Sequence, residues 1–149
     1  MTKENQLWFQ SWFNTPYYHI LYKNRDYKEA ELFIKNLVHY LNLDTESDSV
    51  LDLACGKGRH SIFLNSLGFN VKGIDLSKKS IENASANATN SLSFEVHDMR
   101  TIYDSQFEVV LNLFTSFGYF DNEFDNQNVI RSIKSSLKPN GIGVIDFMN

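Results

Sequence analysis

The sequence has little of several features that define whole classes of proteins. Its 149 residues include a single cysteine, Cys55, so an internal disulfide is excluded and a reducing compartment is indicated. It has no apolar run of about 18 residues, the length that spans a bilayer, and its polar first residues lead into no signal-peptide core. We therefore expect a cytoplasmic protein without a membrane partner.

An excess of positive charge is missing as well. Lysine and arginine number 14 against 18 aspartates and glutamates, which gives a formal net charge of -4, and no basic run is present. Such a chain has no long-range attraction to a phosphate backbone, so we do not expect nucleic acid as a partner. His19, His39 and His97 have no metal-like spacing with one another, and we expect no metal site.

The length and the apolar pattern predict one α/β domain over residues 1–149, with an N-terminal helical cap over 1–45 and a core over 46–149. Five short apolar segments alternate with segments whose apolar residues have helical spacing. We therefore predict a doubly wound, mainly parallel sheet in the order 3-2-1-4-5, with helices on both faces. The predicted strands are 50–54, 70–75, 93–96, 107–114 and 142–148, the predicted helices are 26–41, 59–67, one beginning after Ser77 and 125–137, and a turn is predicted at 139–141.

Aromatic residues are concentrated near the N-terminus, where seven lie between residues 8 and 22. Trp8 and Trp12, like Phe9 and Phe13, are four residues apart, so a short helix would place them along one side. Two compatible interpretations stay open. The segment packs its rings on the domain, or it forms a lid over a ligand.

The stretch 50–60 joins the end of an apolar, β-branched strand to a helix through two glycines. Gly56 and Gly58 carry no Cβ, so the backbone can turn sharply and a ligand can approach closely. The helix that follows points free N–H groups at the same place. Strand, glycine turn and helix are typical of a nucleotide-type ligand site. A dinucleotide fingerprint would also need a small residue at Ser61, and that fit is weak.

Acidic residues recur in order, one near the end of each of the first three predicted strands. They lie in the stretches Asp52-x-Ala54-x-Gly56-x-Gly58, Val71-Lys72-Gly73-Ile74-Asp75-Leu76-Ser77 and Val96-His97-Asp98-Met99. The pattern resembles that of the class I S-adenosylmethionine-dependent methyltransferases, a Rossmann-like family that usually has glycine at the position of Ala54. The likeness covers the chain from about Asp26 to its end. It implies an enzyme that moves a methyl group from S-adenosyl-L-methionine to an unidentified, small-molecule acceptor.

The resemblance and the position of each residue assign roles at the strand ends. Asp75 lies 17 residues after Gly58 and is expected to bond two ribose hydroxyls. Asp98 resembles the residue that accepts from the adenine amino group, and Asp52 is expected to buttress the turn or to bond the methionine amino group. The other cofactor-binding candidates are Ala54, Cys55, Gly56, Gly58, Leu76, His97, Met99, Asn112 and Leu113, with Tyr22 from the N-terminal segment and Arg59 from the first core helix.

The sequence identifies no catalytic residue. Methyl transfer needs no protein nucleophile, so Cys55 is interpreted as a backbone contact, and no His/Glu pair stands out as a general base. Arg59 and His60 open a helix that is expected to face the same crevice, where Arg59 either meets the cofactor carboxylate or is solvated. Asn112 is not followed by the Pro-Pro-Tyr of related enzymes that act on planar amino groups.

Two alternatives to a methyltransferase stay open. An NAD-dependent oxidoreductase would suit Asp75 and the glycines, but it leaves Asp52 and Asp98 unexplained. The other alternative is a non-catalytic S-adenosylmethionine-binding module.

The family normally continues beyond the fifth strand with a helix and an antiparallel strand pair. Here the sequence ends at Asn149, so we expect a core that is C-terminally incomplete and weakly active alone. We also expect either a longer parent enzyme or a homodimer that covers the edge of the fifth strand.

Overall fold

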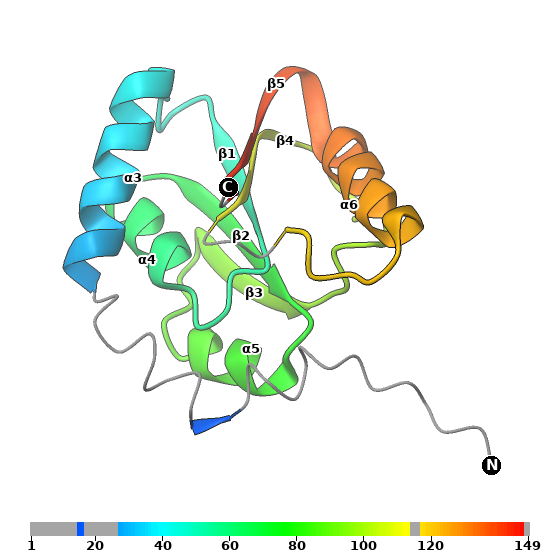
Figure 1. The fold of residues 1–149 in the computed structure, drawn as a ribbon. Helices are drawn as coiled ribbons and strands as arrows, with labels where there is room; N and C mark the ends of the chain where they lie inside the picture. Colours follow the sequence, from blue (N-terminus) through cyan, green and yellow to red (C-terminus); the bar gives the residue numbers. More distant parts are fainter. Residues whose placement is uncertain (1–14, 17–26, 114–116, 148–149) are drawn as a thin grey trace.

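Strands and helices alternate along the chain except between the third and fourth strands, which a loop connects, as Figure 1 shows. The computed structural model describes residues 15–16, 27–113 and 117–147. The elements are α3 (Tyr27–Leu41), β1 (Ser49–Leu53), α4 (Arg59–Ser66), β2 (Asn70–Asp75), α5 (Lys78–Ser85), β3 (Leu92–Val96), β4 (Phe107–Asn112), α6 (Glu123–Ser136) and β5 (Leu137–Ile145).

The five strands form one parallel sheet in the order β3-β2-β1-β4-β5. Strand β1 is central, since Val50 pairs with Val71 of β2 and with Val109 of β4. The predicted doubly wound α/β class and strand order are thus confirmed. In such open sheets ligands bind outside the carboxyl ends of the strands, and the candidate residues that follow β1 to β4 all lie along that edge.

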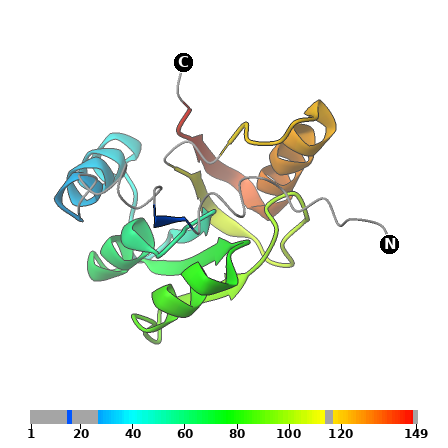
Figure 2. The ribbon, with the colours of Figure 1, turned by 60° about the horizontal axis from the view of Figure 1, so that its bottom comes forward.

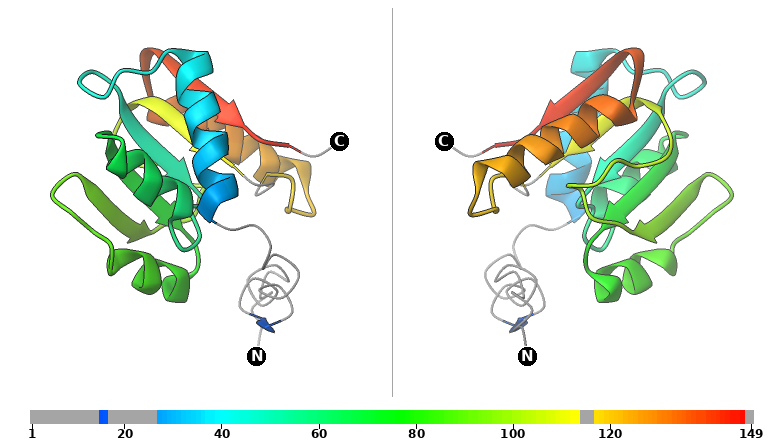
Figure 3. Two further views of the ribbon diagram at one scale, coloured as in Figure 1. Left: turned by 90° about the vertical axis from the view of Figure 1, so that its left-hand side faces the viewer. Right: turned by 90° about the vertical axis from the view of Figure 1, so that its right-hand side faces the viewer.

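Helices cover both faces of the sheet, with α3 and α4 on one face and α6 on the other (Figures 2 and 3). Successive side chains of β1 alternate between these faces, so that Val50 packs with α3 and α4 while Leu51 packs with α6. Because both faces are covered, β1 is buried almost throughout, and Asp52 is the one acidic residue in it. The core on the α3 side consists of Ile34, Val50, Leu64, Phe69, Val71, Leu92, Val109, Leu111 and Leu113.

Most element boundaries agree with those predicted. Strand β2 has its predicted bounds, and Ser77 caps α5 by accepting a hydrogen bond from the Ser80 N–H at 3.2 Å. Helix α6 begins earlier than predicted because Asn122 caps it and accepts a hydrogen bond from the Asp125 N–H at 2.7 Å. Parts of several predicted features lie outside the described residues: Asp26 at the start of the first predicted helix, Phe114 of the fourth predicted strand, Met148 of the fifth, and the N-terminal aromatic residues with Tyr22.

The predicted turn at 139–141 and the predicted start of the fifth strand are wrong. Strand β5 begins earlier because Leu137 already pairs with Phe107 of β4. The register is then irregular until Ile142, and the intervening residues bulge, with Asn140 in the left-handed region at a φ of 63°. The Pro-Asn-Gly sequence therefore produces an irregularity inside an edge strand instead of a turn before it.

Candidate functional site

The turn between β1 and α4 contains three residues with a left-handed backbone. Ala54, Gly56 and Gly58 have φ angles of 56°, 58° and 82°. The turn is fixed by the Cys55 N–H, which donates to the Ile74 carbonyl of β2 at 3.0 Å, and by the Gly58 N–H, which donates to the Cys55 carbonyl at 3.0 Å. Glycine adopts such φ angles without a steric penalty, so Ala54 is the strained member of the three.

The two glycines of the turn serve different purposes. A Cβ added to Gly58 would lie 2.8 Å from the ring of Phe94, so the absence of a side chain there permits packing against β3. A Cβ added to Gly56 would meet nothing within 4 Å. The space beside Gly56 is therefore open, at the edge of the sheet where a ligand can approach the backbone.

We expect Gly58→Ala to destabilise the protein considerably more than Gly56→Ala. A side chain at Gly56 suffers only the left-handed backbone, at about 1–2 kcal/mol. At Gly58 the same strain is joined by overpacking against Phe94, which adds about 1–3 kcal/mol. Urea unfolding of the two variants measures the difference, and equal losses of unfolding free energy would contradict the distinction between the two sites.

Asp75 links the glycine turn to the start of α5. Its Oδ2 accepts a hydrogen bond from the Gly56 N–H at 2.8 Å, and its Oδ1 accepts one from the Ser77 N–H at 2.8 Å. Burial raises the pKa of Asp75, and the two amide hydrogen bonds oppose that rise. The carboxylate therefore sits beside the open space at Gly56, with one bond already made on each oxygen.

Asp52 ties β1 to α4 in the interior. The side chain is 1% exposed, and its Oδ2 accepts a hydrogen bond from the Ser61 hydroxyl at 2.6 Å. Burial raises the pKa of Asp52 to about 7 despite this bond, and the nearby charge of Asp75 raises it further. Two acidic groups of the predicted site thus lie close enough to influence each other.

Neither Cys55 nor His60 offers reactive chemistry at this turn. Burial, and then the charges of Asp52 and Asp75, raise the pKa of the Cys55 thiol far above its usual value, so the sulfur stays protonated. His60 was expected to face the crevice, but it is buried 6.2 Å from the ring of Phe33 on α3. Burial and then the charge of Arg59 lower the pKa of His60 to about 4, so it is neutral at pH 7.

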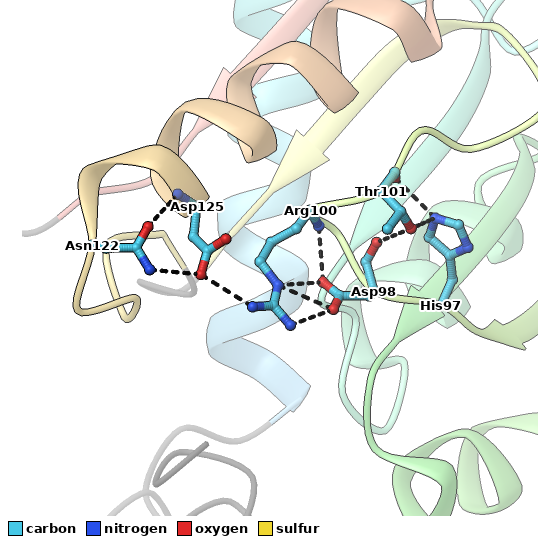
Figure 4. A network of polar contacts seen from close by, with 6 residues as sticks. All are labelled: His97, Asp98, Arg100, Thr101, Asn122 and Asp125. Carbon is cyan, nitrogen blue, oxygen red and sulfur yellow. Dashed lines mark hydrogen bonds and ion pairs between the residues drawn. The ribbon is translucent and has the colours of Figure 1, made fainter. Parts of the chain in front are cut away.

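Asp98 belongs to a charged network that reaches across to α6 (Figure 4). Its carboxylate accepts hydrogen bonds from three N–H groups of Arg100: the backbone N–H at 2.9 Å, Nε at 3.1 Å and Nη2 at 2.6 Å. The Nη1 group of Arg100 donates to Asp125 at 3.2 Å. His97 joins the network through Thr101, because its Nε2 lies 3.0 Å from Oγ1 of Thr101, and this hydroxyl donates to the Asp98 carbonyl at 2.9 Å.

The candidates at the end of β4 and in the neighbouring loop are largely enclosed. Asn112 is fully buried, and its Nδ2 donates to the Leu53 carbonyl at 3.2 Å. Its Oδ1 has no hydrogen-bond partner among the described residues. Leu113 packs in the core on the α3 side, whereas Leu76 and Met99 pack on the α6 side.

The sequence analysis missed the side chains that hold the acidic residues in place. Ser61 was considered only as a small residue of a dinucleotide pattern, although it is the partner of Asp52. Arg100 and Asp125 were given no role. Arg100 follows Asp98 by two residues, and an arginine so close to a loop aspartate was a signal that the pair could be bonded. Among the described residues, no group of three His, Cys, Asp or Glu side chains is placed to hold a metal ion.

Comparison with known proteins gives a consistent set of relatives. A family model described as a methyltransferase domain matches residues 44–149. The putative methyltransferase YqeM of Bacillus subtilis (strain 168) is 38% identical over 105 residues, which cover 68% of this chain and 42% of YqeM. The glycine/sarcosine N-methyltransferase of Aphanothece halophytica is 34% identical over 131 residues, which cover 84% of this chain and 48% of that enzyme.

A solved structure with a similar fold is that of S-adenosylmethionine-bound CalS10, an amino pentose methyltransferase from Micromonospora echinaspora. The TM-score is 0.71 at 21% sequence identity, and the match covers 90% of this chain and 57% of CalS10. At that identity the likeness concerns the fold alone. The chain spans roughly half the length of the relatives it matches, at 42% and 48% for the two described above.

Proposed function

The chain belongs to the class I S-adenosylmethionine-dependent methyltransferase family, and from this premise we propose that it transfers a methyl group from S-adenosyl-L-methionine to a small-molecule acceptor. The observation that carries the proposal is the open space at Gly56 beside the Asp75 carboxylate, at the ends of adjacent parallel strands. The NAD-dependent oxidoreductase alternative receives no support from the comparisons.

The carboxylate oxygens of Asp75 at the end of β2 and of Asp98 after β3 are hydrogen-bond acceptors that suit the nucleoside part of the cofactor. An ionised carboxylate has about four acceptor sites, so Asp75 retains one on each oxygen after bonding the two amides. Two free sites match the two hydroxyls of a ribose. Val96 pairs with Asp75 across the sheet, and Asp98 lies two residues beyond Val96. A nucleoside held at Asp75 would therefore extend its base toward Asp98, which we propose as the acceptor for the adenine amino group.

The amino-acid part of the cofactor is assigned to the other side of Asp75, along the turn that follows β1. Residues 54–58 would contact it through backbone atoms, because the open side of the turn lies at Gly56. Asp52 would act by holding the turn through Ser61. Asn112, with a buried Oδ1 that no described residue bonds, would line the methyl-transfer pocket at the end of β4. Tyr22 and Arg59 remain predicted contacts.

Catalysis would rest on alignment. When bound, the cofactor would supply an electrophilic methyl group on a positively charged sulfur, and a lone pair of the acceptor would bond the methyl carbon as its bond to sulfur breaks, with S-adenosylhomocysteine as the leaving group. Asp75 and the glycine turn would orient the donor, and oriented reactions gain up to about 7–11 kcal/mol over free encounters. The buried, neutral His60 is not placed to act as a general base toward a substrate in the crevice.

The names of the relatives and the charge of the chain both favour a small molecule as the methyl acceptor. The relative from Aphanothece halophytica is named for glycine and sarcosine, and a small acceptor of this kind suits a chain without a basic run. In the described part of the chain no helix is long and apolar enough to cross a bilayer. A cytoplasmic location stays a prediction, as does a homodimer that covers β5, which lies at the sheet edge.

A methyl-transfer assay tests the proposal. The protein is incubated with S-adenosylmethionine and with glycine, sarcosine or an amino sugar nucleotide, and S-adenosylhomocysteine is measured by mass spectrometry. We expect acceptor-dependent product with at least one small amine. Cofactor binding without product for any acceptor would favour the non-catalytic binding module. The absence of both cofactor binding and product would contradict the proposal altogether.

A further inference from the structure

Arg100 joins two parts of the protein that are far apart in sequence. It lies in the loop after β3, and its guanidinium bonds both Asp98 in that loop and Asp125 in the first turn of α6. The guanidinium also lies 4.7 Å from the centre of the Phe120 ring, an attractive cation–π arrangement. Two carboxylates and a ring therefore hold this side chain in one position (Figure 4).

The loop after β3 is also tied to the residue proposed to bind ribose. The His97 N–H donates to the Asp75 carbonyl at 3.0 Å, so the backbone before Asp98 is anchored to the end of β2. Asp98 thus has a fixed backbone on one side and a fixed counter-charge on the other. Its carboxylate has little freedom to rotate without breaking bonds to Arg100.

The hydrogen bonds of Asp98 leave it one acceptor site. Three N–H groups of Arg100 donate to the carboxylate, and the Nε N–H is shared between its two oxygens, so these groups occupy about three of its four sites. The exocyclic amino group of adenine has two N–H donors in the plane of the base, and one of them can use the remaining site. A carbonyl oxygen in the same position of the purine would face a carboxylate that can only accept.

We propose that Arg100 is a positioning residue that keeps Asp98 oriented as an acceptor-only partner for the amino group of adenine, and that it thereby selects adenine over hypoxanthine in the cofactor site. The inference rests on the proposed function and adds a specificity determinant to it. Burial alone would raise the pKa of Asp98, but the Arg100 bonds outweigh burial and hold that pKa below its usual value. A protonated Asp98 could donate to a carbonyl oxygen, and Arg100 disfavours that form.

The test compares two ligands that differ at this edge of the purine, where hypoxanthine has a carbonyl oxygen in place of the amino group and an N–H in place of the bare ring nitrogen beside it. S-adenosylhomocysteine and S-inosylhomocysteine, in which hypoxanthine replaces adenine, are titrated calorimetrically into the wild-type protein and Arg100→Met. We expect the wild type to prefer the adenine ligand by at least about tenfold, as loss of a hydrogen bond to a charged group predicts. Arg100→Met should lose most of this preference, because the guanidinium no longer holds the Asp98 carboxylate in its orientation.

Two further variants separate positioning from general damage. Arg100→Lys keeps the charge but not the two-pronged geometry, and it should retain an intermediate preference. Asp125→Asn removes the charge that anchors Arg100 on α6, leaves the backbone cap of α6 in place, and should lower the preference even if Arg100→Met does not fold. Arg131→Met is the matched control, because Arg131 lies 6.0 Å from the Phe124 ring and is exposed on α6. It should keep the wild-type preference.

The outcomes distinguish this inference from the proposed function. Equal weakening of both ligands in the folded Arg100 and Asp125 variants would show a purely structural role and overturn the inference, as would a wild-type protein that binds both ligands equally. In either case the wild type still binds S-adenosylhomocysteine, so the proposed function stands. Absence of any binding by the wild type would overturn both.

Discussion

Replacing Asp75 by alanine is expected to weaken S-adenosylhomocysteine binding by at least about tenfold, because a hydrogen bond to a charged group contributes about 1.5–3 kcal/mol and two such bonds are proposed. The variant also frees the Gly56 and Ser77 N–H groups that the carboxylate holds in the ligand-free protein. The turn would then be less well ordered for a ligand. Both effects act in the same direction.

Calorimetric titration of Asp75→Ala measures this loss, and thermal unfolding checks that the variant is folded. Asp121→Ala is the control, since it removes the same charge from an exposed position at the start of the α6 region and should leave the affinity unchanged. The affinity of Asp75→Asn for S-adenosylhomocysteine should fall between those of Asp75→Ala and Asp121→Ala, because an amide keeps the shape of the side chain and one acceptor oxygen. Wild-type affinity in a folded Asp75→Ala protein would contradict the assignment of Asp75 to the ribose.

Asp52 is expected to lower the free energy of unfolding of the ligand-free protein as the pH rises from about 4 to about 7, whereas His60, whose pKa is lowered to about 4, acts in the opposite direction over much of this range. Burial raises the pKa of Asp52 from 3.8 in the unfolded chain to about 7 in the fold. Over that window the folded state keeps a proton that the unfolded state releases, so raising the pH favours unfolding. A pKa difference of this size between the folded and unfolded states changes the free energy of unfolding by at most about 4 kcal/mol.

Urea unfolding of the wild type and of Asp52→Asn across this range isolates the effect. Asparagine cannot ionise and keeps an oxygen for the Ser61 hydroxyl, so the wild type should lose stability relative to the variant as the pH rises. The comparison removes the opposite trend of Glu108, where bonds from Lys138 and Ser49 outweigh burial and lower the pKa to about 2. A stability difference that does not change with pH would contradict an ionisable, buried Asp52.

The sheet could be predicted because its signals are local. The apolar segment before the glycines and the capping Ser77 mark where elements end, and the alternation of strands with helices limits the topology. The place of Asp75 beside the glycine turn could be predicted for the same reason, whereas its contact with ribose stays a prediction.

The supporting contacts could not be predicted, because they depend on which surfaces meet in the fold. His60 is buried because α3, far earlier in the chain, covers the start of α4. Arg100 finds its second carboxylate on α6, 25 residues later. The strand start at Leu137 depends on pairing with Phe107 of β4, which outweighs the local turn preference of Pro139 and Gly141.

The binding of S-adenosylhomocysteine to the wild-type chain, measured by calorimetry beside NADH, tests the central claim most directly. The open glycine turn, the two remaining acceptor sites of Asp75 and the single remaining site of Asp98 predict saturable binding of one S-adenosylhomocysteine per chain, and the match to the methyltransferase family predicts no binding of NADH. Binding of NADH, or a folded protein that shows no heat of binding with S-adenosylhomocysteine, would contradict the account.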